Sequence, residues 1–132
     1  MFHLTIRSRD DLTLFPDPER QRRALRRLGR VAGDALVAFS LADNHFHLLA
    51  RGDRRAVGRT AQRVGCALSP VAAASLAPAR YTAITGRSHL MNAVRYLLRQ
   101  AAHHGLGEHP ARWRGSCLPD LLGARVIDGL AL

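Results

Sequence analysis

The chain contains no lysine: all 20 of its basic residues are arginine. Cysteine is also scarce, and the only two, Cys66 and Cys117, lie far apart, which excludes a disulfide framework and a cysteine zinc site. No apolar run approaches the roughly 18 residues that a membrane-spanning helix needs, and no charged leader precedes an apolar segment at the N-terminus. We therefore expect a soluble, cytoplasmic protein without a membrane partner.

The second feature is a large excess of positive charge. With 20 basic residues against 10 acidic ones, the formal net charge is +10. A GC-rich genome explains the missing lysine but explains neither the sign nor the size of this charge. Arginine forks suit bidentate contacts with phosphate, and a strongly basic protein meets polyanions faster. Nucleic acid is therefore the expected partner.

At 132 residues, the chain has the size of one domain, and we expect a single domain over residues 1–132. Apolar alternation predicts strands, and apolar residues at helical spacing predict helices. The predicted strands are Phe2–Ile6, Ala35–Leu41, His45–Arg51 and Arg80–Ile84, and the predicted helices cover 18–32, 53–70 and 89–104. Their order predicts an α+β fold, a ferredoxin-like split βαβ arrangement with an antiparallel sheet of four or five strands and helices packed on it. Pro110, Pro119 and several glycines predict a loosely packed tail over residues 107–132.

Residue types that favour helix ends mark the predicted helices. Asp17 followed by Pro18 is typical of a helix N-terminus, Asp53 begins the second helix, and Ser88 is the expected cap of the third. The first helix should bury Ala24, Leu25, Leu28 and Val31. Its opposite face is rich in arginine, which indicates either a solvated face or a surface that follows phosphates.

The segment most suggestive of chemistry is Asn44-His45-Phe46-His47-Leu48-Leu49. Successive side chains on a strand point to opposite faces, so His45 and His47 should project together while Phe46 points the other way. Two adjacent imidazoles supply two of the ligands of a metal site. Taken alone, such a pair is also compatible with an ordinary polar sheet face.

Polar residues also follow one side of the third predicted helix. Leu90, Val94, Leu97 and Ala101 form its apolar face, which should pack on the sheet. A second stripe runs beside this face and consists of His89, Asn92, Tyr96, Gln100 and His103. Tyr96 and Gln100 are one helical turn apart, so a phenol and an amide can face the same point.

Together these segments resemble the HUH single-tyrosine transposases, and the match is best with the REP-associated tyrosine transposases. A His-x-His strand followed about fifty residues later by a Tyr-x-x-x-Gln helix is the core of this resemblance. The segments that carry it cover most of the chain: Phe2-His3-Leu4-Thr5 with Arg7, Asn44 to Leu49, Ala79-Arg80-Tyr81, Arg95-Tyr96 through Gly105-Leu106, and Trp113 with Ser116.

The resemblance implies a metal-dependent enzyme that cleaves single-stranded DNA and transfers the strand through a 5′-phosphotyrosine, as in DNA transposition. Tyr96 would be the nucleophile, and His45, His47 and Gln100 would bind Mg²⁺ or Mn²⁺, which accept imidazole and carbonyl ligands. The expected partner is single-stranded or hairpin DNA, bound by a monomer or homodimer. DNA binding is expected to rest on Arg7, Arg23, Arg27, Arg51, Arg80, Arg95 and Arg99.

The sequence is compatible with more than one role for several histidines and with more than one function. His3 could support the metal ligands from the neighbouring strand, and His89 and His103 either assist proton transfer or phosphate binding or are surface histidines; His104 and His109 have no expected chemical role. The segment from Gly65 to Pro78 is shorter than in the family, which favours an alternative: a catalytically degenerate, domesticated transposase that binds hairpin or single-stranded DNA. A metal phosphoesterase acting on small esters through activated water is a third hypothesis.

Overall fold

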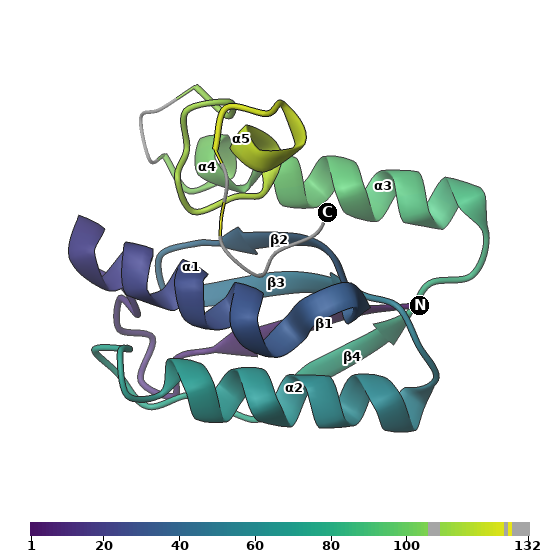
Figure 1. Cartoon of the computed structure of the whole chain (residues 1–132), viewed down its shortest axis with the longest axis horizontal. Coiled ribbons are helices and arrows are strands. Elements are labelled where there is room, and N and C mark those ends of the chain that lie inside the picture. Colours follow the sequence, from purple (N-terminus) through teal and green to yellow (C-terminus); the bar gives the residue numbers. More distant parts are fainter. Residues whose placement is uncertain (106–108, 126, 128–132) are drawn as a thin grey trace.

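A four-stranded antiparallel sheet forms the centre of the computed structural model, which describes residues 1–105, 109–125 and 127 (Figure 1). Its strand order is β2-β3-β1-β4, so the last strand pairs with the first. This is the order of a ferredoxin-like sheet, and the predicted α+β fold with helices on an antiparallel sheet is confirmed. The strands are β1 (Phe2–Arg7), β2 (Leu36–Leu41), β3 (His45–Ala50) and β4 (Arg80–Ala83).

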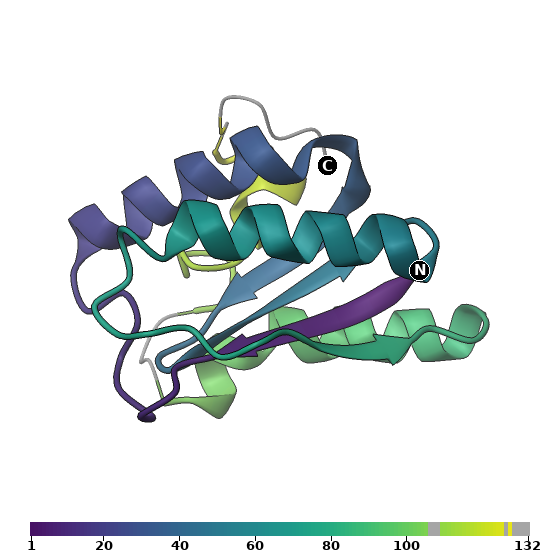
Figure 2. The same cartoon turned by 90° about the horizontal axis from the view of Figure 1, so that it is seen from below.

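Helices cover both faces of this sheet. Helices α1 and α2 pack side by side on one face, and α3 crosses the other face, as the view from below shows (Figure 2). Among the described residues, no helix is both long and apolar enough to cross a bilayer. The helices are α1 (Pro18–Ala32), α2 (Arg54–Leu68), α3 (Arg87–Leu98), α4 (Gln100–His103) and α5 (Leu118–Leu121), with a short 3-10 turn, η1 (Gly33–Ala35).

Two aspartates begin the helices of the first layer, as predicted. Asp17 Oδ1 accepts the backbone N–H of Arg20 (2.8 Å), and Asp53 Oδ1 accepts that of Ala56 (2.7 Å). Each bond satisfies one of the N–H groups that the first turn of a helix leaves unpaired. Ala24, Leu25 and Leu28 are buried against the sheet as expected, whereas Val31 is only half-buried.

The strand β3 lies in the middle of the sheet, and all six of its residues are buried. Phe46 and Leu48 belong to the main hydrophobic core, which also includes Leu4, Ile6 and Phe39. The intervening His45 and His47 project to the opposite face, where α3 lies, because strand side chains alternate. A polar pair is thus placed under a helix.

The helix predicted over roughly residues 89–104 is present, but its predicted cap and its continuity are wrong. Helix α3 begins one residue after Gly86, whose φ of +92° suits glycine, so Ser88 is not the cap. The helix then breaks at Arg99, with ψ near 0°, and resumes as α4. No glycine or proline marks this break in the sequence. Beyond it, Gln100 and Ala101 are both fully buried.

The tail is not loosely packed throughout, contrary to the prediction. The backbone N–H of Leu41 donates to the carbonyl of Gly115 (2.6 Å), and that of Cys117 donates to Phe39 O (3.1 Å). The indole N–H of Trp113 donates to Leu41 O (3.2 Å). These bonds cover the open edge of β2, a position where an unpaired strand would invite aggregation. Within the predicted tail, residues 107–108, 126 and 128–132 lie outside the described residues, as does Leu106 at the helix exit.

Candidate active site

The His-x-His pair lies on β3 beside strand β1. In the antiparallel register, His45 is opposite Arg7 and His47 is opposite Thr5. The two imidazole centres are 4.6 Å apart, and both side chains are almost completely buried. The predicted common direction of the two rings follows from the strand pleat. Which groups surround them is decided by β1 and by α3 and α4.

The ring of His45 is oriented by its sequence neighbour. His45 Nδ1 lies 2.8 Å from Oδ1 of Asn44, and Asn44 in turn donates from Nδ2 to Asp11 Oδ1 (3.0 Å). Because an amide oxygen only accepts, the Nδ1 of His45 carries the proton in this bond. Its Nε2 therefore keeps a free lone pair, as in histidines whose second nitrogen binds a metal.

The ring of His47 is held by two side chains of β1. Its Nδ1 lies 3.0 Å from His3 Nε2 and 3.2 Å from Thr5 Oγ1, both on β1. Its Nε2 is buried and has no hydrogen-bond partner among the described residues. Buried polar atoms are nearly always paired, so this nitrogen has a lone pair available for a further partner.

Both imidazoles are neutral at pH 7. Burial, and then the nearby His104, lower the pKa of His45 to about 4. Burial, and then His45 itself, lower the pKa of His47 to about 3. Burial and the proximity of His89 also lower the pKa of His3. Neutral histidines retain the lone pair that metal coordination requires.

Gln100 reaches the histidine pair from the first residue of α4. Its side chain is fully buried, and its proximity raises the pKa values of both His45 and His47, against the larger lowering by burial. The amide Nε2 donates to the carbonyl of Tyr96 (3.2 Å), and Oε1 accepts from His104 Nε2 (3.2 Å). These two bonds hold the amide between the Tyr96 carbonyl and the His104 ring.

His104 is the residue that sequence reasoning missed. Its ring centre is 5.0 Å from that of His45, whereas His103, expected on the polar stripe, is exposed to solvent. The only sequence signal was the spacing of four residues from Gln100, which places two side chains on one face of a helix.

Tyr96 lies at the mouth of the site, on the same side of the sheet as the histidines. Its ring centre is 5.2 Å from His47 and 6.1 Å from His3, and 45% of the residue is exposed. An exposed phenol beside buried neutral imidazoles is accessible to a large substrate. Tyr81, the other tyrosine, belongs to the opposite layer, where the Arg54 guanidinium of α2 stacks on its ring.

An open pocket of about 490 Å³ joins these groups. Arg7 and Arg80 supply positive charge, and His89 and Asn92 line it from α3. Two further lining residues, Thr5 and Ala93, come from β1 and α3. The complete lining is His3, Thr5, Arg7, His45, His47, Arg80, His89, Asn92, Ala93 and Tyr96.

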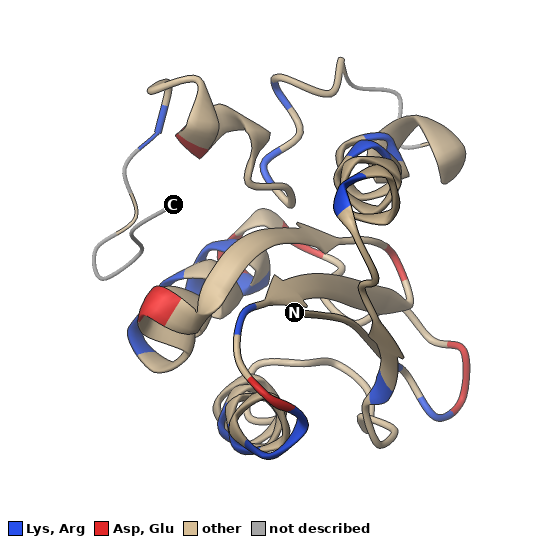
Figure 3. Cartoon of the chain, turned by 90° about the vertical axis from the view of Figure 1, so that its right-hand side faces the viewer, with Lys and Arg blue, Asp and Glu red and all other residues tan. Residues whose placement is uncertain are grey.

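The other arginines expected to bind DNA lie elsewhere. Arg95 and Arg99 are exposed on or next to α3, and Arg51 is exposed after β3. Arg23 and Arg27 belong to α1, on the opposite layer, and Arg27 Nη1 donates to the carbonyl of Ala67 (3.0 Å). Figure 3 shows basic positions on helices on both sides of the sheet. The positive charge is therefore spread beyond the pocket.

Among the described residues, no three histidine, cysteine or carboxylate side chains are arranged as a metal site. A metal at the histidine pair would need a third donor of another kind. The amide oxygen of Gln100 is that kind of donor, on a fully buried side chain close to both histidines.

No protein-family model and no curated protein matches the chain. Among solved structures, the chain is similar to that of a REP-associated tyrosine transposase bound to a REP hairpin, with a TM-score of 0.71 and 14% identity over 99% of this chain and 87% of the other. The chain has the fold of a REP-associated tyrosine transposase. The resemblance seen in the sequence motifs is thus confirmed at the level of the fold.

Proposed function

We propose that this protein cleaves single-stranded DNA and rejoins it through a 5′-phosphotyrosine on Tyr96. The observation that carries the proposal is the half-exposed phenol of Tyr96, whose ring centre lies 5.2 Å from that of the buried, neutral His47. Arg7 and Arg80 border the same pocket and suit the phosphates that flank a scissile bond. The similar transposase is bound to a REP hairpin, which supports hairpin or single-stranded DNA as the substrate class.

The proposal includes a divalent cation, Mg²⁺ or Mn²⁺, held by His45, His47 and Gln100. The residues fit such an ion: His47 Nε2 is buried without a partner, and bonds at Nδ1 leave the lone pair of His45 on Nε2. The ion would polarise the scissile phosphate when bound. His3, Thr5 and Asn44 would keep the two rings in the correct tautomer and orientation.

In the cleavage step, the phenol oxygen of Tyr96 attacks phosphorus and forms the new P–O bond. The bond from phosphorus to the 3′ oxygen breaks, and the phenol proton ends on the released 3′ hydroxyl. Solvent can carry this proton because Tyr96 is 45% exposed. The phosphotyrosine retains the energy of the original diester, so a 3′ hydroxyl can reverse the step and join strands without ATP.

The test is a covalent adduct. Wild-type protein incubated in Mn²⁺ with a labelled hairpin that carries single-stranded extensions should give a protein–DNA band in denaturing gel electrophoresis. Tyr96→Phe should abolish that band. Tyr81→Phe is the matched control, because it removes the only other phenol from the opposite layer. An adduct of equal yield with Tyr96→Phe would overturn the proposal.

A second candidate function is a hairpin-binding module that does not cleave. It is favoured by the missing third histidine, cysteine or carboxylate donor among the described residues. Such a module would bind hairpin DNA with steep salt dependence but form no adduct with any hairpin or single strand in Mg²⁺ or Mn²⁺. Hydrolysis of small phosphate esters without an adduct, and without need of Tyr96, would instead indicate a phosphoesterase.

A further inference from the structure

A second pocket lies between α1 and the C-terminal segment over residues 109–125 and 127. Its volume is about 890 Å³, larger than that of the histidine pocket. One wall is the exposed face of α1, with Arg22 and Arg26, and the other includes Arg112 and Arg114. Pro18 contributes exposed apolar surface at the start of α1. We call this the α1–tail groove.

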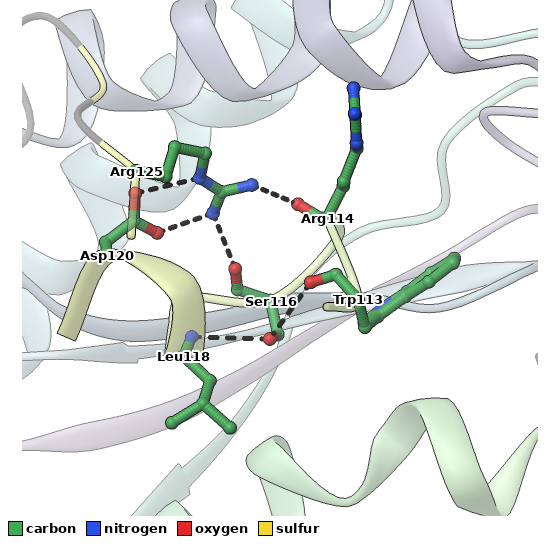
Figure 4. Close-up of polar contacts among 6 residues, drawn as sticks. All are labelled: Trp113, Arg114, Ser116, Leu118, Asp120 and Arg125. Carbon is green, nitrogen blue, oxygen red and sulfur yellow. Dashed lines mark hydrogen bonds and ion pairs between the residues drawn. The ribbon is translucent and has the colours of Figure 1, made fainter. Parts of the chain in front are cut away.

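The wall opposite α1 is held in place by the guanidinium of Arg125 (Figure 4). Arg125 Nε donates to Asp120 Oδ1 (2.9 Å), and the other two nitrogens donate to the carbonyls of Arg114 and Ser116. The side chain of Arg114 points away from this cluster toward the helices (Figure 4). Arg125 therefore fixes the backbone, and Arg114 remains on the groove side.

The charge of the groove has one sign. Arg22, Arg26, Arg112 and Arg114 are all exposed, and none of the described residues that line the groove is acidic. Glu19 pairs with Arg22 from outside the lining (2.9 Å), but both side chains are more than half exposed, so this pair holds Arg22 only weakly. The groove thus offers guanidinium groups from two walls to an anionic ligand.

We propose that the α1–tail groove is a second DNA-binding site, which holds the sugar–phosphate backbone outside the cleavage pocket. The two sites are separate: the groove is formed by α1 and the tail next to β2, whereas the pocket is lined by β1, β3, β4 and α3. The inference rests on the proposed DNA substrate but not on cleavage.

The lining favours a nucleic-acid backbone over an acidic peptide. Each strand of a DNA duplex presents a phosphate about every 3.4 Å along the helix axis, so the backbone meets arginines on both walls at any register. An acidic peptide would need carboxylates at matching positions. Sugars can lie on the exposed ring of Pro18 while phosphates meet the guanidinium forks.

The experiment compares two triple variants that lose the same charge. Arg26→Gln/Arg112→Gln/Arg114→Gln changes the groove, and Arg55→Gln/Arg59→Gln/Arg63→Gln changes exposed arginines of α2. Binding of a fluorescent hairpin is followed by anisotropy between roughly 50 and 200 mM NaCl, since each phosphate contact contributes about 0.9 to the slope of log K against log salt. The groove variant should lose about 2 to 3 from this slope, and the α2 variant less than 1.

Further arms separate the explanations. Replacing the three groove arginines by lysine should keep most of the slope, which shows that charge and not folding is responsible. Equal slopes for the groove and α2 variants would overturn the proposal that the α1–tail groove binds DNA, even if wild-type protein forms the Tyr96 adduct. A smaller slope for the groove variant, with no adduct for wild-type protein, would support DNA binding in the groove and reject the proposed cleavage. No binding of hairpin by wild-type protein would reject both, and a groove-dependent affinity for polyglutamate but not for DNA would identify a peptide site instead.

Discussion

The buried histidine pair should make the protein sensitive to mild acid. A histidine has a pKa near 6.5 when unfolded, whereas burial lowers those of His45 and His47 to about 4 and about 3 in the folded state. As the pH falls below about 6.5, the unfolded chain takes up protons that the folded protein cannot accept. Stability is therefore fully present above this pH and declines until the folded pKa values are reached.

The magnitude follows from these values. Each proton bound only by the unfolded chain changes the free energy of unfolding by about 1.4 kcal/mol per pH unit, so the pair contributes a slope of about 2.7 kcal/mol per unit. Between pH 7 and pH 5, each histidine lowers the free energy of unfolding by about 2 kcal/mol, and the pair lowers it by about 4 kcal/mol. That is a large part of the roughly 5 to 15 kcal/mol of a typical domain.

The assay is urea unfolding followed by circular dichroism from pH 4.5 to 7, with EDTA present so that no cation binds. His47→Asn should lower the slope by about 1.4 kcal/mol per pH unit, because one of the two groups is removed. Burial is the largest cause of the low pKa of His45 and persists in this variant, so the second contribution remains. Replacing the exposed His109 by Gln controls for loss of any imidazole. Parallel pH profiles for wild type and His47→Asn would refute the reasoning.

Three other changes test the support of the site and the fold. Asn44→Ala removes the acceptor of His45 Nδ1 and should weaken Mn²⁺ binding about 10- to 100-fold in calorimetry; unchanged affinity would contradict this orienting role. Gly115→Ala would place a Cβ 2.7 Å from Leu41 O and should destabilise the protein by about 1–3 kcal/mol in thermal unfolding. Gly65→Ala, whose new Cβ would have no atom within 4 Å, should stabilise it by about 0.5–1 kcal/mol. Effects of the same sign for both substitutions would contradict the close packing of the tail at Gly115. Leu97→Ala, at the fully buried contact of α3 with the sheet, should cost about 2–5 kcal/mol, and a loss below 1 kcal/mol would mean that α3 does not depend on this contact.

Local sequence patterns determined much of this protein. The alternation of β3 fixed the common direction of His45 and His47, and the side chains of Asp17 and Asp53 fixed the starts of α1 and α2. These features depend on residues within about four positions of each other, whose relative geometry is set by the pleat of a strand or the turn of a helix. The order of elements then left few ways to arrange the sheet.

Only the tertiary structure decided which groups meet the histidines. His3 and Thr5 contact His47 across more than forty positions of sequence, and no local rule gives that register. The break at Arg99 turns Gln100 into the buried site and leaves His103 in solvent, although no helix-breaking residue marks it. The docking of Gly115 and its neighbours on β2 likewise depends on an edge that exists only once the sheet is assembled. Such contacts form because packing buries side chains that are distant in sequence. A pattern within one helix or strand does not determine which other elements pack against it.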